Sequence, residues 1–524
     1  MTDTQGNTGA QVVMRRLLAE GVDVCFANPG TSEMHFVAAL DTAPDMRPVL
    51  CLFEGVATGA ADGYARIAGR PAATLLHLGP GMANGLANLH NARRAHSPVV
   101  NIVGDHATYH KSLDAPLESD IDALGAWLHG VVHRPGSAAE LDAAVRSAVR
   151  DAVGPPGKVA TVILPADYSW DRAQEPASSA VPAKINRTGD TGDTEDTIDV
   201  IAAADLLRAH GDKVVILLGG AATAAAGLTA AARIHTATGA RTVVETFPAR
   251  LARGRGIPPL DRLQYLGEFA TQQLAGATHL ILAGTRKPVS FFAYPGKPSE
   301  LAPADAQVHT LAPVDLEKLA DVLGAEAPAL PEPDPLPAPT GPLTVQNWPL
   351  VIAALLPENA IISDEANTSG VLLPAATASA PPHDVLTLTG GAIGQGLPVA
   401  VGAAVAAPDR PVIALQADGS AAYTISALWT MAREQLDITA VILNNHAYAI
   451  LQMELQRVGT TASGDRSRSL LDIGHPDIDF ATIAQGFGVP ATRAGTAEEL
   501  AAQFAAAIEE PGPHLIDAAI GRLP

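Results

Sequence analysis

Two apolar segments near the end of the chain are each followed by a polar residue suited to hold a metal ion. The first segment, 411–417, runs into Asp418, and the second, 438–443, runs into Asn445 after one further residue. More than a dozen residues with a helical pattern separate the segments, which predicts two parallel strands whose carboxyl ends share one sheet edge. Asp418 and Asn445 should therefore lie close together at that edge.

The residue types at this edge favour a magnesium and phosphate site. Mg²⁺ prefers a few hard oxygen ligands, completed by phosphate oxygens and water, and Asp418 and Asn445 offer such oxygens. Gly419 permits close approach of the backbone to a phosphate, and a helix that opens at Ser420 would point its free N–H groups to the same place. Each dipeptide alone is an ordinary turn or strand end, so the indication comes from their spacing.

The stretch from Asp418 to Thr430, together with Asn445, resembles the thiamine diphosphate signature of the 2-oxoacid decarboxylase and acetohydroxyacid synthase superfamily. The likeness is strongest to benzoylformate decarboxylase and to acetolactate synthase-like catalytic subunits, and it extends over nearly the whole chain. The first glycine of the signature is Ala417 here. The resemblance implies that Mg²⁺ is bound by Asp418, Asn445 and the carbonyl of Ala447, and that the cofactor also contacts Gly419, Ser420 and Tyr448.

The same resemblance implies an α/β fold of three doubly wound parallel-sheet domains. These would be a pyrimidine-binding domain at 1–175, a middle α/β domain at 198–323 and a diphosphate-binding domain at 343–524. A length of 524 residues agrees with about three domains of ordinary size. The intervening segments, 176–197 and the Pro-rich 324–342, are interpreted as linkers.

The first third of the chain repeats the layout of the last third. Segments 71–77 and 98–103 are apolar and follow each other at the spacing of the two strands described above. This alignment brings His77 level with Ala417, which predicts a second ligand-facing sheet edge of similar architecture. That edge lacks the metal-binding residues and is expected to serve another purpose.

Glu54 is the candidate for that purpose. It follows the apolar run 49–53 and opens a helix of small residues, where a glutamate often does no more than complement the helix dipole. Segment 53–64 is similar to the family segment whose glutamate hydrogen-bonds the pyrimidine ring of thiamine diphosphate. The resemblance thus implies that Glu54 binds the cofactor and favours the imino tautomer that removes the thiazolium C2 proton.

Further cofactor contacts are expected at the start of the last third. Segment 363–368 ends a strand, where Asn367 and Thr368 could reach phosphate. In the glycine-rich segment 388–394, the resemblance implies that the Gly391 carbonyl accepts the 4′-amino group of the pyrimidine. Ile393 would then be the apolar wedge that bends the cofactor into a V.

Candidate residues for substrate binding are sought in four places in the sequence. Thr31 lies in the tight turn 28–33, where benzoylformate decarboxylase has a serine. His77 matches that enzyme's active-site histidine and could position a substrate carboxylate and carry a proton near neutral pH. The family's second histidine is not found in segment 286–296. His110, in a loop at the predicted ligand edge, could replace it.

A pocket just beyond Ala447 would be lined by Leu451 and Met453, which favours small or aromatic apolar acyl groups. Glu454 nearby complicates this picture, because an unpaired buried carboxylate would repel an anionic acid.

The function implied is decarboxylation of a 2-oxoacid, with the acyl carbanion passed to a carbonyl acceptor, as in an acetolactate synthase-like carboligase, or to a proton. Segment 79–84 looks like acetohydroxyacid synthase, although the chain ends soon after 512–516, too early for that enzyme's closing extension. Three alternatives stay open: a simple decarboxylase of benzoylformate type, an acyl-CoA lyase of the 2-hydroxyacyl-CoA lyase or oxalyl-CoA decarboxylase kind, and a catalytically silent cofactor-binding homologue. An acyl-CoA lyase would need a basic groove for CoA, and only Arg286 and Lys287 indicate one.

Charge and composition limit the partners. A formal net charge of −21 argues against nucleic acid and against an anionic membrane surface. The chain lacks a signal-peptide pattern and any apolar run of membrane-spanning length, so a cytoplasmic enzyme is expected. The resemblance implies a homo-oligomer, usually a tetramer, with the active site at a dimer interface.

Two smaller features complete the sequence. Gly219-Gly220 is a weak dinucleotide signal, so FAD is not expected but stays open. Cys25 and Cys51 are interpreted as core residues.

Overall fold

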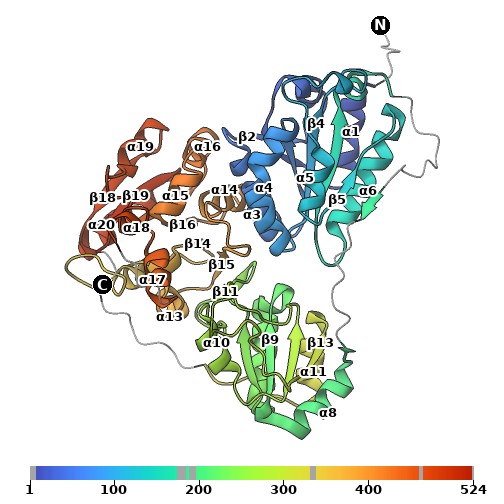
Figure 1. Ribbon diagram of the computed structural model, residues 1–524. Helices are drawn as coiled ribbons and strands as arrows, with labels where there is room; N and C mark the ends of the chain where they lie inside the picture. Colours follow the sequence, from blue (N-terminus) through green and yellow to red (C-terminus); the bar gives the residue numbers. More distant parts are fainter. Residues whose placement is uncertain (1–6, 174–184, 188–195, 331–337, 459–463, 522–524) are drawn as a thin grey trace.

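The computed structural model describes residues 7–173, 185–187, 196–330, 338–458 and 464–521. The chain forms three α/β domains, each built on one mostly parallel sheet with helices packed against it (Figure 1). The predicted fold class is therefore confirmed, whereas the predicted domain boundaries stay a prediction.

The first domain holds a seven-stranded sheet in the order β2-β1-β3-β4-β6-β5-β7, in which only β7 is antiparallel to its neighbour. Its strands are β1 Val24–Asn28, β2 Arg47–Leu50, β3 Ala72–Leu76, β4 Val99–Asp105, β5 Val131–His133, β6 Val159–Pro165 and β7 Ile185–Arg187. Its helices are α1 Gly9–Ala19, η1 Thr31–Glu33, α2 Met34–Ala39, η2 Leu40–Thr42, α3 Glu54–Ala68, α4 Leu78–Arg94, η3 Lys111–Leu113, α5 Ile121–Trp127, η4 Ala138–Glu140, α6 Leu141–Val153 and α7 Ala166–Trp170.

The middle domain holds a five-stranded parallel sheet in the order β10-β9-β12-β13-β8. Its strands are β8 Asp196–Thr197, β9 Val214–Leu218, β10 Arg241–Val244, β12 His279–Ala283 and β13 Gln307–Leu311. Its helices are α8 Val200–His210, η5 Gly211–Lys213, η6 Gly220–Thr223, α9 Ala225–Thr238, α10 Gly267–Leu274, η7 Pro313–Asp315 and α11 Leu316–Val322.

The last domain holds a seven-stranded sheet in the order β11-β15-β14-β16-β17-β19-β18. Its strands are β14 Ile361–Glu365, β15 His383–Thr387, β16 Val412–Ala417, β17 Ile438–Asn444, β18 Ala491–Ala494 and β19 His514–Ala519, joined by β11 Leu251–Arg253, an antiparallel edge strand from the middle of the chain. Its helices are α12 Trp348–Leu355, η8 Asn367–Gly370, α13 Leu373–Ala376, η9 Thr377–Ser379, α14 Gly396–Ala406, α15 Asp418–Tyr423, α16 Ala427–Glu434, α17 Ala449–Arg457, α18 Asp465–Ser469, α19 Phe480–Gly486 and α20 Ala497–Glu509.

The two strand pairs singled out in the sequence are present and parallel. In the last domain Val412 lies opposite Ile438, and in the first domain Ala72 lies opposite Val99. The partners are 26 residues apart in the last domain and 27 in the first. The shared architecture is thus confirmed. Because the two offsets differ by one residue, an alignment that places His77 on Ala417 misaligns the second strands by one residue.

Helices α3 and α14 hold the first and last domains together. A Cβ atom on Gly402 of α14 would lie 1.8 Å from the carbonyl oxygen of Ala60 in α3, and one on Gly63 would lie 2.1 Å from that of Val399. Only glycine permits so close an approach of two helix backbones. The run of small residues after Glu54, read from the sequence as a helix, therefore forms the contact between two domains.

Several other expectations can be set against the structure. Cys25 and Cys51 are buried free thiols, as expected for core residues. Within the described ranges, no helix is long and apolar enough to cross a membrane. The Pro-rich stretch 331–337 and most of the segment 176–197 lie outside the described residues.

Candidate active site

A buried carboxylate lies at the carboxyl edge of the last sheet, where β16 and β17 end. Asp418 accepts hydrogen bonds from the backbone N–H groups of Gly419 (2.8 Å), Asn445 (3.0 Å) and His446 (2.7 Å). Burial raises the pKa of Asp418, and the three N–H donors oppose that rise. No Lys or Arg side chain among the described residues forms an ion pair with it. A buried carboxylate without such a counter-charge favours a cation at this place.

Asn445 and Tyr448 lie beside Asp418. The Asn445 side chain accepts from the Ala447 N–H (3.0 Å) and donates to the Ser369 hydroxyl (3.3 Å). The Tyr448 ring covers Gly419, because a Cβ atom there would lie 2.5 Å from the ring. The parallel strands thus bring the predicted metal-binding residues together.

The neighbouring strand β14 contributes the next group. The Asn367 amide donates to the Ser420 hydroxyl (3.0 Å), and Thr368 follows it, half-buried, in η8. The helix after β16 begins at Asp418, two residues earlier than predicted, and spans only six residues. Ser420 therefore lies within the first turn of α15, and its hydroxyl already accepts a bond.

The glycine-rich loop with Gly391 and Ile393 lies against the first domain. Gly391 is exposed with φ of +74°, and Ile393 is half-buried. From α4, Asn91 donates to the Ala392 carbonyl at 2.7 Å. On the other side, the fully buried Glu365 accepts from the N–H groups of Gly394 and Gly396. Glu365 was missed in the sequence because its partners lie about thirty residues further along.

Glu54 is the first residue of α3 and is buried. Its Oε2 accepts from the Asn84 amide of α4 at 3.0 Å, and its Oε1 lies 3.0 Å from where a Cβ atom on Gly81 would stand. Asn84 was quoted in the sequence only as part of a family motif. The structure makes it the side chain that fixes one oxygen of Glu54.

His77 directly precedes α4, and a buried acid holds its ring. Its Nδ1 lies 2.8 Å from Glu33 Oε2 and 3.3 Å from the Ser32 hydroxyl. Glu33 is fully buried and also accepts from the Gly30 N–H at 2.8 Å. Thr31, in the same turn, is exposed. Glu33 was not identified as a functional residue from the sequence. The one local signal for it was that a charged residue ends the tight turn 28–33.

His110 belongs to a separate part of this edge. Its ring lies 5.4 Å from that of His106, and it is half-buried. None of the hydrogen bonds found among the described residues connects His110 to His77 or to Glu54. Nearby Asp105 forms ion pairs with Arg134 and Lys111, so its carboxylate is not free to bind a ligand.

The residues expected near an acyl pocket lie on α17, and their role stays a prediction. Leu451 and Met453 are exposed on α17. Glu454 is paired with Arg457 at 2.8 Å, so the concern about an unpaired carboxylate was wrong. The structure adds that Arg457 also bonds Glu268 of the middle domain.

Two groups of candidate residues emerge from this geometry. One surrounds Asp418 in the last domain, and the other joins Glu54 with Asn84, and His77 with Glu33, in the first. Among the described residues no cluster of three His, Cys, Asp or Glu side chains could hold a metal. A metal at Asp418 would accordingly depend on amide and carbonyl oxygens and on a ligand's own oxygens.

Comparison with known proteins assigns both groups to one family. Residues 7–126 match the N-terminal TPP binding domain of thiamine pyrophosphate enzymes, and residues 367–518 match the C-terminal TPP binding domain. The first match contains Glu54 and His77, and the second contains Asp418 and Asn445.

Relatives match over nearly the whole chain. A Mycobacterium tuberculosis protein with the provisional description acetolactate synthase large subunit IlvX is 57% identical over 98% of this chain and 99% of its own length. Benzoylformate decarboxylase of Pseudomonas aeruginosa is 30% identical, covering 96% of this chain and 97% of its own. The solved thiamine diphosphate-dependent 4-hydroxybenzoylformate decarboxylase of Rhodococcus jostii superimposes with a TM-score of 0.83 at 25% identity, covering 98% and 99% of the two chains.

The chain belongs to the family of thiamine pyrophosphate enzymes. Within that family it is a thiamine diphosphate-dependent enzyme related to acetolactate synthase and to benzoylformate decarboxylase.

Proposed function

We propose that this enzyme uses thiamine diphosphate and Mg²⁺ to decarboxylate a small 2-oxoacid and to pass the acyl group to a carbonyl acceptor or to a proton. The observation that carries the proposal is the buried Asp418 carboxylate, held by three backbone N–H groups beside the amide of Asn445. Such a site suits a divalent cation that bridges the protein and a diphosphate.

The last domain would hold the diphosphate end of the cofactor. Asp418, Asn445 and the Ala447 carbonyl are proposed as Mg²⁺ ligands. The Asn367 amide and the Ser420 hydroxyl, which bond each other at 3.0 Å, could turn toward phosphate oxygens, with Thr368 beside them. Gly419 and the Tyr448 ring over it would bound the site.

The ring end of the cofactor would lie between Gly391, Ile393 and Glu54. The Gly391 carbonyl would accept from the 4′-amino group, and Ile393 would support the bend between the two rings. When bound, thiamine diphosphate supplies a carbon nucleophile and takes up the electrons left by the departing CO₂. The task of Glu54 is to hold a proton at the pyrimidine nitrogen, and Asn84 keeps its carboxyl group in one orientation.

The substrate would be met by residues of the first domain. His77 is oriented by the buried Glu33, which suits a group that holds a carboxylate and carries a proton. Thr31 is proposed to contact the substrate from the adjacent turn. His110 is the candidate for a second proton carrier if its loop moves toward His77.

A simple decarboxylase acting on an aryl 2-oxoacid is the second candidate. Two relatives that cover nearly the whole chain are named for benzoylformate or 4-hydroxybenzoylformate decarboxylation. The exposed apolar side chains of Leu451 and Met453 suit an aryl group near Ala447. An acyl-CoA lyase is less well supported, because Lys287 is paired with Glu300.

We infer that the working unit is at least a homodimer. Large apolar side chains are exposed near the candidate residues of both domains: Tyr109, Leu113, Val371, Tyr423 and Leu470. In this proposal a second chain would cover these side chains. Each site would then combine Glu54 of one chain with Asp418 of the other, and a tetramer would pair two such dimers.

The test is a product analysis of the reconstituted enzyme. The protein would be stripped of cofactor, restored with thiamine diphosphate and Mg²⁺, and supplied with pyruvate or benzoylformate while products are followed by NMR. Acetolactate would establish carboligation, and aldehyde alone would establish simple decarboxylation. Saturable cofactor binding without turnover of either acid would contradict the proposal.

A further inference from the structure

The loop that joins β15 to α14, residues 388–395, carries both residues proposed to contact the cofactor rings, Gly391 and Ile393. The backbone of Gly391 has a φ of +74°, and that of Gly394 has a φ of +93°. Glycine adopts such angles easily, but it also has more conformational freedom to lose than any other residue. The β15–α14 loop therefore needs contacts from outside to keep one conformation.

A buried carboxylate holds the end of this loop. Glu365, the last residue of β14, accepts from the backbone N–H of Gly394 at 2.7 Å through one oxygen and from that of Gly396 at 2.6 Å through the other. The second oxygen also accepts from the amide of Gln416, its neighbour on β16, at 2.6 Å. Donors thus engage both oxygens, and an amide in place of the carboxylate would turn an NH₂ group toward one of them.

Glu365 also stabilises the start of the helix that follows the loop. The N-cap of α14 is Gln395, whose side chain is directed elsewhere and donates to the Thr387 carbonyl at 2.9 Å. The first N–H groups of a helix lack partners within it, and the helix dipole favours a negative charge beside them. Burial raises the pKa of Glu365, and the N–H and amide donors around it limit the rise.

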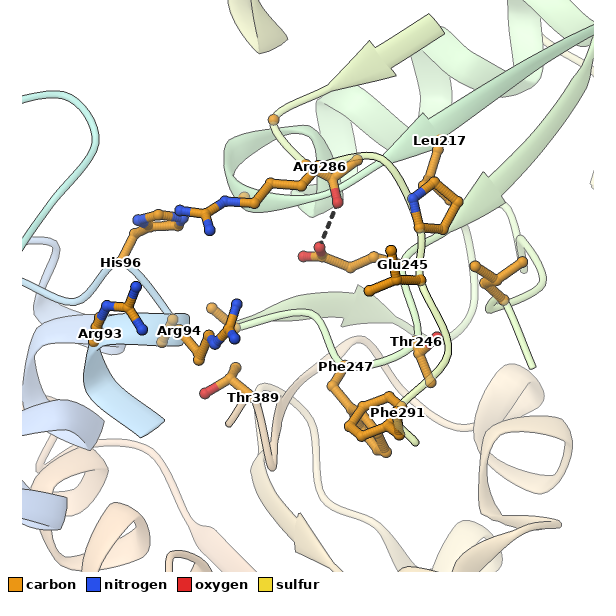
Figure 2. Close-up of a pocket in the computed structure, with 18 residues that line it drawn as sticks. Arg93, Arg94, His96, Leu217, Glu245, Thr246, Phe247, Arg286, Phe291 and Thr389 are labelled. Carbon is orange, nitrogen blue, oxygen red and sulfur yellow. Dashed lines mark hydrogen bonds between the residues drawn. The ribbon is translucent and has the colours of Figure 1, made fainter. Parts of the chain in front are cut away.

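The first domain holds the middle of the loop. The buried Asn91 of α4 accepts from the Ala392 N–H at 3.2 Å and donates to the Ala392 carbonyl at 2.7 Å. The Thr389 hydroxyl donates to the Asn91 carbonyl at 2.8 Å. Thr389 also borders a cavity of about 250 Å³ where the three domains meet, together with Arg94 of the first domain and Arg286 of the middle domain (Figure 2). The loop is thus held on the side of α4 as well as on the side of β14.

The held residues alternate with the residues proposed to contact the cofactor. Gly390, Ala392 and Gly394 each hydrogen-bond a group outside the loop. Gly391 lies between the first two of these and is exposed, and Ile393 lies between the last two and is half-buried. The positions of Gly391 and Ile393 are therefore set by their neighbours in the chain.

We propose that Glu365 and Asn91 are positioning residues, which hold the β15–α14 loop so that the Gly391 carbonyl and Ile393 are in place before the cofactor binds. The inference rests on the proposed function, because that function places the cofactor rings at this loop. A preset loop avoids the cost of ordering on binding and keeps the contacting groups within the small tolerance that catalysis requires. The diphosphate end has separate support, from the donors around Asp418.

The first test uses the protein without cofactor. Amide hydrogen–deuterium exchange of peptides that cover 388–396 is followed by mass spectrometry. We expect slow exchange in the wild type and exchange at least about tenfold faster in Glu365→Gln, because the N–H groups of Gly394 and Gly396 lose their shared acceptor. Asp199→Asn, at the acidic N-cap of α8 in the middle domain, is the control and should leave this segment unchanged.

The second test separates the two ends of the cofactor by calorimetry with Mg²⁺ present. Thiamine diphosphate contacts both ends of the proposed site, whereas pyrophosphate has no ring and contacts only the diphosphate end. Glu365→Gln should bind thiamine diphosphate about tenfold more weakly, as expected for the loss of one well-placed contact, and pyrophosphate within about twofold of the wild type. A merely structural residue would not separate the two ligands in this way.

Three results would overturn the proposal. These are equal amide exchange of the loop in wild type and Glu365→Gln, unchanged affinity for thiamine diphosphate, and equal weakening of both ligands. Failure of the wild type to bind thiamine diphosphate would instead contradict the proposed function, because the exchange test needs no cofactor. If Glu365→Gln folds poorly, judged by its melting temperature, Asn91→Leu removes both bonds to Ala392 and provides the same comparisons.

Discussion

Individual charged side chains in this protein are fixed by hydrogen-bond partners that lie next to them in the fold. Asp418 is held by three backbone N–H groups, Glu54 by Asn84, and His77 by Glu33. Each acid is buried, where its interactions are strong and the loss of a partner is costly. Such residues are suited to chemistry because their orientation is set before any ligand arrives.

The substitution Glu54→Gln should lower kcat by about 10²–10⁴-fold, because the amide cannot exchange a proton with the pyrimidine ring. Cofactor affinity should change much less, since the shape of the side chain is kept. Glu317→Gln, an exposed glutamate in the first turn of α11, is the control. Steady-state kinetics with the active 2-oxoacid give the result, and unchanged turnover would disprove the assigned role.

The substitution Asp418→Asn should weaken Mg²⁺-dependent binding of thiamine diphosphate by about tenfold or more, because a charged oxygen ligand becomes neutral. The new amide would also face the N–H groups of Asn445 and His446, which need acceptors. Calorimetric titration of the apoenzyme measures the effect. Asp517→Asn, at a buried carboxylate on β19, controls for the cost of burying an amide, and comparable losses in both variants would count against a metal at Asp418.

At the scale of elements, the contact between α3 and α14 decides how the first and last domains sit together. The buried Arg66 of α3 adds to that contact by donating to the Thr387 carbonyl at 2.7 Å and to the Thr389 hydroxyl at 3.0 Å. Asp62, one turn earlier, pairs with Arg66 and compensates its charge. The same helix begins at Glu54, so domain packing and the position of the candidate catalytic acid are linked.

The substitution Gly402→Ala should destabilise the protein by about 1–3 kcal/mol or more, because the new methyl group meets backbone that cannot yield. The control is Gly486→Ala in α19, where a Cβ atom would have open space around it. Apparent melting temperatures of the two variants give the comparison. If both melt alike, the close crossing of α3 and α14 does not stabilise the fold.

Across the whole molecule, an ion pair between Arg250 and Asp384 connects the middle part of the chain to the last domain. Asp384 on β15 forms ion pairs with Arg410 and with Arg250, and Arg250 directly precedes the edge strand β11. Burial acts to raise the pKa of Asp384, but the two arginines outweigh it and hold the pKa below its usual value. The pair therefore stabilises the folded protein above the unfolded pKa of about 4, and its contribution is lost as the pH falls through the folded pKa.

The substitution Asp384→Asn should cost about 1–2 kcal/mol near pH 7, a value reduced because Arg250 is partly exposed and screened by solvent. The difference from wild type should shrink between pH 7 and pH 3, because the stabilisation by the carboxylate is progressively lost below its unfolded pKa of about 4. Urea unfolding at the two pH values tests this. Asp205→Asn, from an exposed pair on α8, should show no such dependence, and a constant deficit in Asp384→Asn would refute the assignment.

Local patterns of residues were sufficient to predict the strands and their polar ends. Apolar runs that end in Asp418, Asn445 and Glu54 predicted parallel strands with polar residues at their carboxyl ends, because strand direction and side-chain burial follow from neighbouring residues. The family resemblance then gave these residues their expected roles.

Which distant residues meet depends on the folded arrangement of the domains. Glu33 with His77, Asn84 with Glu54, and Glu365 with the Gly394 loop join positions that no local pattern connects. The cavity lined by Arg286 and Arg94 needs all three domains to be in place. The physical reason is that such contacts depend on how whole helices and sheets pack, and a one-residue difference in strand offset cannot be read from spacing alone.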